Sequence, residues 1–266
     1  MAQPRYERPL TNAGRPLPMT ELAWRKEVVF ICRLLWEKGY AIASDGNVSV
    51  KLAPARYLVT PSGFSKGFIE PDQLLIINDQ LEVVGAQHGA ARGLRPSSEM
   101  LLHLEAYRQR PDIGAVVHAH PPTAIALSIA GISLARCVLP EVIMGMGLIP
   151  TTAYATPASA EGAVVIRDLI QRYDALILQR HGSVTVAGTP FEAYLKLEKL
   201  EAAANITRML LQMGREHPFP SAEVAKLVQW RQDKGLMKPG QAEDLCETCG
   251  VCLRNGQCLA GALKAA

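Results

Sequence analysis

The sequence predicts an α/β protein in which helices cover one sheet that contains antiparallel strand pairs. Segments with strand character alternate with segments whose apolar residues recur at helical spacing. Several neighbouring strand segments are joined by tight turns, and antiparallel strands are the ones that such turns connect. With 266 residues, of which 48% are hydrophobic, the chain is long enough to bury a sizeable core.

One long helix opens the ordered pattern, and short strands follow it. Residues 20–38 place apolar side chains on one helical face, and Gly39 is of the type that commonly ends a helix. Turn sequences such as SDGN, PSG and ND separate the next apolar segments, so we expect strands between them. These strands are expected at 40–43, 48–52, 57–60, 74–77 and 81–84.

Strands and helices are mixed in the second part of the chain. Ser97 and Ser98 are favourable at a helix start, and they predict a helix that ends near Arg110. Further strands are expected at 114–120, 149–154, 175–179 and 184–186, and further helices from 123 and over 159–173.

The last long helix has the clearest start in the chain. Thr189 is expected to cap it, Pro190 lies in its first turn, and Glu192 completes a capping box. The helical pattern continues to about Met213. We therefore expect one helix over this whole stretch.

Prolines and glycines interrupt the pattern from Gly214 onwards. The weaker periodicity there is typical of an appendage rather than of a second core. We therefore divide the chain into a main body, residues 1–213, and a C-terminal extension with a cysteine-rich tail, residues 214–266.

Composition and charge argue against several kinds of partner. The formal net charge is only +3 and aromatic residues are 6% of the chain, which gives little support to nucleic-acid binding. No apolar stretch is long enough for a membrane span, and the N-terminal residues lack the apolar run of a secretory signal. Four of the six cysteines crowd near the C-terminus, which favours a reducing compartment. We expect a cytoplasmic protein with a small-molecule partner.

Three histidines and one glutamate have the pattern of a metal site. His118 and His120 are two residues apart on an expected strand, so their side chains share one face. His181 lies where another strand meets a glycine turn, and Glu99 lies in the expected first turn of a helix. Three neutral imidazoles suit zinc, with the carboxylate as a ligand that substrate displaces. The alternative is that these histidines are structural, as we expect for His103.

Small residues at three turns have the chemistry of an oxyanion site. Hydroxyl groups and free backbone N–H groups at tight turns and helix starts suit phosphate. Each turn alone is also ordinary turn chemistry, and none of them is a P-loop or a dinucleotide fingerprint. The residues concerned are Gly46, Asn47, Ser62, Gly63, Ser97 and Ser98.

Taken in order, five segments resemble the class II aldolase/adducin family over about residues 19–213. They read SDGNVSV, TPSGFSKG, SSEMLLH, AVVHAHP and LQRHGSVTVAG. The resemblance implies a catalytic domain with a three-layer α/β/α fold, a central mainly antiparallel sheet and a zinc-type divalent ion. It also implies a homotetramer with sites at subunit interfaces. The implied reaction is retro-aldol cleavage of a ketose 1-phosphate through a metal-stabilised enediolate.

The resemblance also implies roles for single residues. His118, His120 and His181 match the metal-binding histidines of the family. Glu99 matches the glutamate that ligates metal in the resting enzyme and then acts as acid and base. The substrate phosphate pocket matches Gly46, Asn47, Ser62, Gly63, Ser97 and Ser98.

Departures from the family pattern leave the substrate open. Fuculose-type enzymes carry a tyrosine after the HxH strand, and residues 137–141 contain none. Glu141 falls near the catalytic glutamate of related dehydratases, so it is either a second acid/base or a charged turn residue. Tyr154 has no assigned role. Glu99 stands where the family's 4-epimerases have aspartate, and the Ser-Ser-Glu triplet favours aldol cleavage over dehydration.

Two other functions stay open beside the aldolase. One is a sugar-phosphate dehydratase or decarboxylase of the same family, with Glu141 as base. The other is a non-catalytic scaffold similar to adducin. The metal ligand set favours an enzyme over the scaffold.

The C-terminal cysteines are not part of the family pattern. Their spacing, C-x2-C-x2-C-x5-C, suits an iron–sulfur cluster or a second, structural zinc ion. A tail with reduced thiols is the third interpretation. The candidate ligands are Cys246, Cys249, Cys252 and Cys258.

Overall fold

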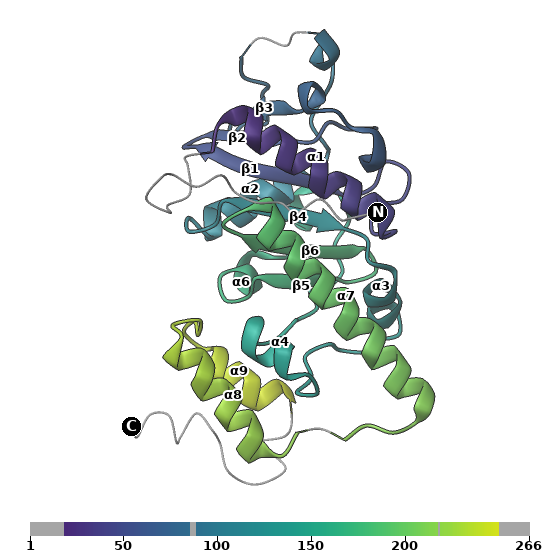
Figure 1. The fold of residues 1–266 in the computed structure, drawn as a ribbon, viewed down its shortest axis with the longest axis vertical. Coiled ribbons are helices and arrows are strands. Elements are labelled where there is room, and N and C mark those ends of the chain that lie inside the picture. Colours follow the sequence, from purple (N-terminus) through teal and green to yellow (C-terminus); the bar gives the residue numbers. More distant parts are fainter. Residues whose placement is uncertain (1–18, 86–88, 218, 250–266) are drawn as a thin grey trace, which may run out of the picture.

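A computed structural model describes residues 19–85, 89–217 and 219–249 (Figure 1). Its centre is a six-stranded sheet with the order β3-β2-β1-β4-β6-β5. Every neighbouring pair in this sheet is antiparallel, which confirms the predicted class. The strands are β1 (Asn47–Ala53), β2 (Arg56–Val59), β3 (Leu75–Ile77), β4 (Ala115–Ala119), β5 (Ala175–Leu178) and β6 (Gly182–Ala187).

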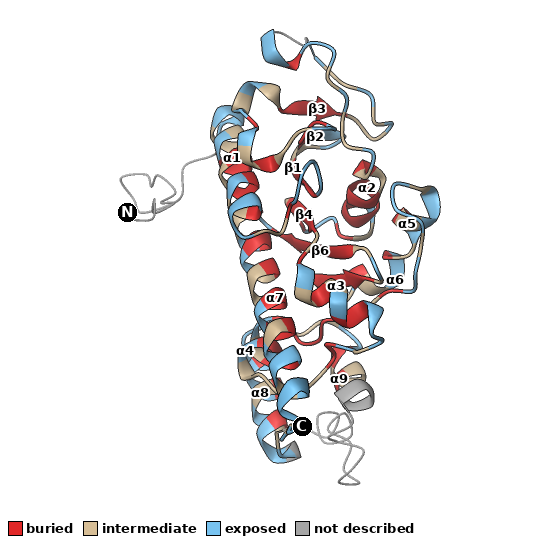
Figure 2. Ribbon diagram, turned by 90° about the vertical axis from the view of Figure 1, so that its right-hand side faces the viewer, coloured by how far each residue is buried: buried red, intermediate tan, exposed pale blue. Residues whose placement is uncertain are grey.

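Helices cover both faces of the sheet, so the fold has three layers (Figures 1 and 2). One face carries α1 (Glu21–Glu37) and α7 (Pro190–Met213), and the other carries α2 (Met100–Gln109), α5 (Ala160–Val164) and α6 (Arg167–Ile170). Side chains alternate between the faces as strand geometry requires. In β1, Val48 and Val50 pack in the core beneath α1, while Ser49 hydrogen-bonds to residues of α2. The predicted α/β/α architecture is confirmed.

Both long helices begin at a capping threonine, and for the second of them the sequence predicts that cap. The Thr20 side chain accepts a hydrogen bond from the Ala23 N–H at the start of α1. The Thr189 side chain accepts from the Glu192 N–H at the start of α7, and Gly214 ends that helix with φ +65°. An N-cap oxygen satisfies one of the N–H groups that a helix start leaves without a partner. Local sequence therefore sets the position of both helices.

Three predicted strands are not strands in the structure. Residues 40–43 turn away from the end of α1, because the N–H groups of Tyr40 and Ala41 bond to Leu35 O and Ala43 has φ +53°. Residues 81–84 contribute only the isolated bridge between Ile77 and Val83.

The third wrong strand is 149–154, which forms only an isolated parallel bridge from Thr151 to Ile177. Pro150 has no N–H to donate to a ladder. The predicted helix over 159–173 is divided into α5 and α6, and the β-branched run Val164-Val165-Ile166 lies at the division. Such a run is unfavourable in a helix.

The remaining helices pack around the lower part of the fold in Figure 1. Their apolar side chains join the core of the sheet. Val142 is buried in one cluster with residues of α7, and Val224, Val228 and Leu245 are buried in another cluster with residues of α2. Arg231 fixes α8 to the end of α4 by donating to Met144 O at 2.6 Å. These helices are α3 (Pro122–Ile129), α4 (Pro140–Gly145), α8 (Ser221–Asp233) and α9 (Gln241–Cys249), and the short 3-10 turns are η1 (Lys66–Phe68), η2 (Pro71–Gln73) and η3 (Gly89–Ala91).

The predicted tail cluster lies outside the described residues. Cys252 and Cys258 fall beyond residue 249, and the side chains of Cys246 and Cys249 are not described, although both residues belong to α9. Over the residues that are described, no helix combines the length and the apolar character needed to cross a membrane.

The inward face of α7 should contribute strongly to stability. Leu197 is 0% exposed beneath the sheet, whereas Leu195 on the same helix is 44% exposed. We expect Leu197→Ala to lower the free energy of unfolding by about 2–5 kcal/mol, because it leaves a cavity. Leu195→Ala is the matched control and should change it by less than about 0.5 kcal/mol. Urea denaturation measures both, and equal losses would contradict the packing described here.

Candidate functional site

Three histidines meet at one end of the central strands. His118 belongs to β4, His120 follows that strand directly, and His181 immediately precedes β6. Because β4 and β6 pair with His118 opposite Val184, their ends lie side by side. The ring centroids are 4.8–5.0 Å apart in all three pairs. The structure therefore brings together the three imidazoles that the sequence singled out.

Gly182 allows this close approach. A Cβ atom there would lie 2.5 Å from Ala119 O and 2.8 Å from the His120 ring. Any side chain would push β6 away from β4 and separate the rings. The glycine after His181 is thus required by the packing of the site.

Glu99 lies between two of the imidazoles. Its Oε2 is 2.9 Å from His118 Nε2, and its Oε1 is 3.1 Å from His181 Nε2. The helix was expected to begin at Ser97-Ser98, but α2 begins at Met100, so Glu99 takes the cap position rather than the first turn. One ligand atom from each of the four residues lies within 4.8 Å of the others.

The protonation pattern of this cluster fits a bound cation. His118 Nδ1 donates to Ser183 O at 2.9 Å, so in a neutral ring Nε2 carries a lone pair that faces the Glu99 carboxylate. Two acceptors at that distance need a proton or a metal ion between them. His118 Nε2 and His120 Nε2 face each other in the same way at 3.1 Å.

The pKa values in the cluster agree with this pattern. Burial, and then the neighbouring His118 and His181, lower the pKa of His120 to about 4, which keeps its ring neutral near pH 7. Burial alone would raise the pKa of Glu99, but positive charge and hydrogen bonds from His118 and His181 hold it well below its usual range, and a metal cation in place of the shared protons would act in the same direction. Neutral imidazoles and an ionised carboxylate are the forms that ligate a divalent metal.

A buried hydrogen-bonded chain holds Glu99 from the α2 side. Asn47 Nδ2 donates to Glu99 Oε2 at 3.1 Å, and Asn47 Oδ1 lies 2.6 Å from His103 Nε2. His103 Nδ1 in turn lies 2.7 Å from Ser49 Oγ, which is 2.9 Å from the Tyr107 hydroxyl. Burial and the nearby His118 lower the pKa of His103 to about 3, so the ring is neutral.

Neutrality fixes the direction of every bond in this chain. The Asn47 amide oxygen only accepts, so His103 Nε2 donates to it and His103 Nδ1 accepts from the Ser49 hydroxyl. Ser49 then has no second hydrogen, so Tyr107 donates to Ser49. Sequence reasoning missed Ser49 and Tyr107 and gave His103 a structural role. The spacing of Glu99, His103 and Tyr107, one helical turn apart each time, was the available signal.

A cleft of about 320 Å³ opens beside the cluster. Glu99, His120 and His181 form part of its wall, and Lys66, which the sequence analysis did not single out, forms another part. Two of the turns in the wall have glycines with φ of +71° and +78°, which other residues rarely adopt. All six residues of the predicted oxyanion site line this cleft: Gly46, Asn47, Ser62, Gly63, Ser97 and Ser98.

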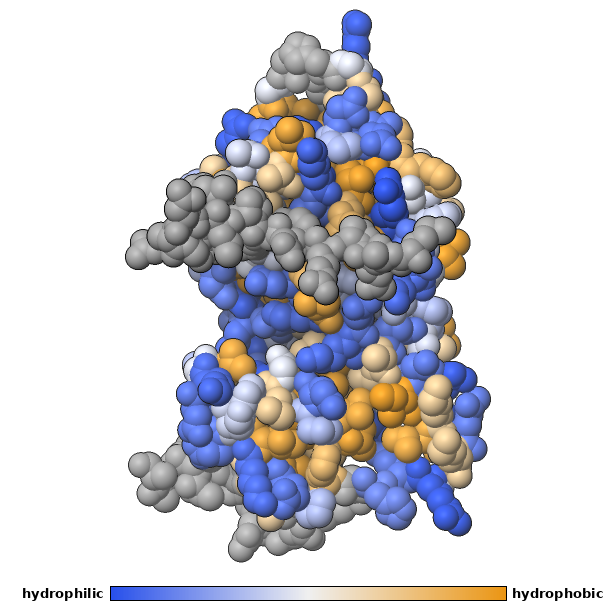
Figure 3. Space-filling model, viewed as in Figure 1, coloured by the Kyte–Doolittle hydropathy of each residue, from blue (hydrophilic) through white to orange (hydrophobic). Residues whose placement is uncertain are grey.

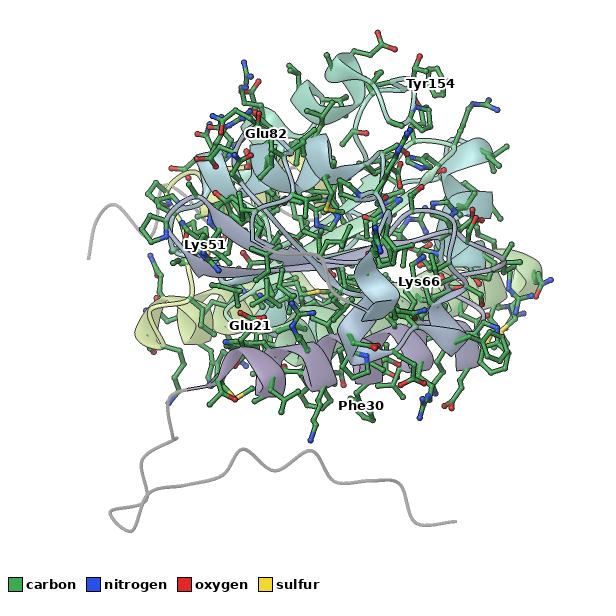
Figure 4. The ribbon with its side chains drawn as sticks, turned by 90° about the horizontal axis from the view of Figure 1, so that it is seen from above. Glu21, Phe30, Lys51, Lys66, Glu82 and Tyr154 are labelled. Carbon is green, nitrogen blue, oxygen red and sulfur yellow. The ribbon has the colours of Figure 1, made fainter. Side chains whose placement is uncertain are left out.

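Two residues considered in the sequence analysis are not brought to the cleft in this chain. Glu141 is exposed in the first turn of α4. Tyr154 is 58% exposed, and Figure 4 shows it at the rim of the molecule, far from Lys66. Neither residue is part of the cleft wall.

Comparisons with known proteins agree with this geometry. The family described as Class II Aldolase and Adducin N-terminal domain matches residues 26–207. An L-fuculose phosphate aldolase of Methanococcus maripaludis is 33% identical over 184 residues, which are 69% of this chain and 96% of that protein. A 3-oxo-tetronate 4-phosphate decarboxylase of Escherichia coli K12 is 32% identical over 194 residues, 71% of this chain and 88% of that protein.

Solved structures show the same fold. YgbL from Escherichia coli aligns with a TM-score of 0.70 at 29% identity, over 78% of this chain and 99% of that chain. An L-fuculose 1-phosphate aldolase aligns with a TM-score of 0.70 at 24% identity, over 79% of this chain and 97% of that chain. Since the family match spans most of the sequence and includes all four residues of the cluster, the chain belongs to the class II aldolase/adducin family.

Proposed function

We propose that this protein is a metal-dependent carbon–carbon lyase that cleaves a small sugar phosphate, a ketose 1-phosphate, by a retro-aldol reaction. The observation that carries the proposal is Glu99 held between His118 and His181 at the wall of the cleft. The family relationship supports it, because relatives about 30% identical include L-fuculose phosphate aldolases.

The three histidines and Glu99 would hold one divalent ion, for which zinc is our proposal. When bound, such an ion supplies a Lewis acid that stabilises negative charge developing on a substrate oxygen. The antiparallel strands hold His118 and His181 rigidly, and the Ser183 carbonyl keeps His118 Nε2 directed at the site. The four tail cysteines are outside this assignment.

Glu99 is the residue that we propose moves the proton. Carbon–carbon cleavage leaves an electron pair beside the carbonyl carbon, and a proton must reach that carbon to complete the reaction. In the resting site Glu99 is ionised and both of its oxygens are held, Oε2 by His118 and Asn47 and Oε1 by His181. We propose that substrate displaces Oε1, which then takes the proton released by the substrate hydroxyl and delivers it to the carbon. Asn47 keeps Oε2 oriented through this exchange.

The turns along the cleft are proposed to bind the substrate phosphate. Backbone N–H groups at Gly46 and Gly63 and hydroxyls at Ser62, Ser97 and Ser98 line one wall. Donors of this kind bind an oxyanion, and they convert binding energy into orientation of the bond to be broken.

Decarboxylation of a sugar-acid phosphate is the second candidate, and its support is the 32% identity to the decarboxylase of Escherichia coli. Loss of CO₂ also leaves an electron pair beside a carbonyl group. The same cluster can therefore stabilise either reaction. In the decarboxylase, Glu99 would first take up a proton from water and then pass it to the carbon that CO₂ has left. Detection of CO₂ rather than an aldehyde distinguishes the two.

Assembly and location complete the proposal. We infer a homotetramer in the cytoplasm, as the family resemblance implies. Exposed apolar side chains near the end of α7 support an assembled state, and Figure 3 shows hydrophobic residues gathered on that part of the surface. They are Ile206, Met209, Leu211 and Met213.

Removal of metal should abolish activity and weaken the fold. We expect exhaustive chelation to remove cleavage of a panel of ketose 1-phosphates, and zinc to restore it. Since the ion binds the folded state, zinc at about 100 times its Kd should add roughly 2.7 kcal/mol to the free energy of unfolding. Cleavage and denaturation assays measure the two effects. Activity that survives complete metal removal would contradict the proposal.

Glu99 should matter more than Glu141. We expect Glu99→Gln to lower kcat by about 10²- to 10⁴-fold, because the amide cannot carry the proton. The dehydratase alternative uses Glu141 as its base, so Glu141→Gln tests it. Because Glu141 lies outside the cleft wall of this chain, we expect this variant to keep most of its activity. A larger loss in the Glu141 variant would favour dehydration over aldol cleavage.

The buried chain behind Glu99 should influence catalysis without touching substrate. Ser49→Ala removes the hydroxyl that fixes the His103 ring, so Asn47 and Glu99 lose their orientation. We expect kcat or metal affinity to fall by about 10- to 100-fold, with KM little changed. Steady-state kinetics and zinc competition with a chelator measure this. Full activity in a folded Ser49→Ala protein would show that the chain is only structural.

A further inference from the structure

Lys66 is a buried cation that the proposed chemistry does not use. It opens η1, and only 2% of it is exposed. Its ammonium donates to two carbonyl oxygens, Ser44 O at 2.9 Å and Phe64 O at 2.8 Å. Among the ion pairs of the described residues, none includes Lys66. Burying an ammonium without a counter-ion is costly, so the chain has placed an uncompensated positive charge at this point.

That charge lies between the two glycine turns of the cleft. Ser44 is the first residue of the SDGN turn that contains Gly46, and Phe64 directly follows Gly63. Lys66 also forms part of the cleft wall itself. In Figure 4 it lies at the opposite end of the sheet from Lys51. Lys66 therefore ties together the two turns that are proposed to bind phosphate.

The backbone around Lys66 is held by close packing against α1. A Cβ atom on Gly67 would lie 2.6 Å from the Trp36 ring, and the Trp36 and Phe68 rings are 5.5 Å apart. The turn η1 is thus pressed onto the end of α1, which fixes the place of its first residue. A cation that is fixed before the ligand arrives binds an anion with little ordering cost.

We propose that Lys66 is the specificity-determining residue with which this protein recognises the charge of its substrate's anionic group. Two N–H groups of the ammonium hold the turns, and the third binds an oxygen of a phosphate placed between them. The turn amides and serine hydroxyls alone can bind any oxyanion, whereas a buried ammonium favours a dianion over a monoanion or a neutral hydroxyl. The inference rests on the proposed function and adds the basis of its substrate selectivity.

Burial also makes Lys66 responsive to a bound anion. Burial lowers the pKa of Lys66, although Cys32, Asp45 and Glu99 act in the opposite direction. A dianion in the cleft favours the charged form and supplies the missing countercharge. Ligand and lysine therefore stabilise each other.

Titration with inorganic phosphate, followed by calorimetry, tests the inference on both chelator-treated and zinc-loaded protein. We expect Lys66→Gln to weaken phosphate binding by about 10- to 100-fold, because a charged hydrogen bond is lost. Lys66→Arg should retain most of the affinity. Lys51→Gln is the matched control, since it removes one positive charge at the other end of the sheet, and it should bind as the wild type does.

Equal phosphate affinity in wild type and a folded Lys66→Gln protein would overturn the inference, leaving Lys66 as a support for the turns. If Lys66→Gln does not fold, the wild-type protein with ¹⁵N-labelled lysine decides. We expect the Lys66 ammonium signal, identified by its absence in Lys66→Arg, to shift as phosphate is added while that of Lys51 stays. An unmoved Lys66 signal would overturn the inference equally.

The same experiment separates this inference from the proposed function. Phosphate affinity is measured without turnover, so it does not depend on the reaction being aldol cleavage. If Lys66→Gln still cleaves the sugar phosphate in a metal-dependent way and binds phosphate as the wild type does, the inference is wrong and the proposed function stands. Lysine-dependent phosphate binding in a protein that cleaves no sugar phosphate would remove the proposed reaction and keep the inference.

Discussion

The pairing register of three adjacent strands is the constraint on which the site depends. His118 lies opposite Asn47 of β1 on one side and opposite Val184 of β6 on the other. Because successive side chains point to opposite faces, a shift of one residue would turn His118 towards α1 and away from Glu99. The apolar residues on the α1 face, such as Val117 and Ala119, oppose that shift. Core packing on one face thus fixes the chemistry on the other.

A polar layer occupies the opposite face where a core would normally be apolar. Ser49, His103 and Tyr107 are fully or almost fully buried, and each satisfies its neighbour's hydrogen bond. Satisfied buried networks specify one arrangement, whereas unsatisfied ones are costly. This layer differs from the buried Lys66, whose positive charge has no ion-pair partner among the described residues. The first is complete within the protein, and the second is completed by a ligand.

Sequence reasoning succeeded where the signal is local or periodic. The two-residue spacing of His118 and His120 placed both imidazoles on one face, and the cap at Thr189 placed the start of α7. It failed where contacts outside a repeating pattern decide, whether they are local or distant in the sequence. Residues 40–43 have strand-like composition, but the end of α1 bends them into a turn. Lys66 could not be recognised, because its burial results from packing between η1 and α1 and from carbonyls in two separate turns.

The crystal structure of the zinc-loaded protein, with anomalous scattering measured at the zinc edge, tests the central claim most directly. The account predicts one strong anomalous peak about 2.0–2.1 Å from the Nε2 atoms of His118, His120 and His181. An ordered structure in which these three rings turn away from one another, or in which zinc is absent from the space between them, would contradict it.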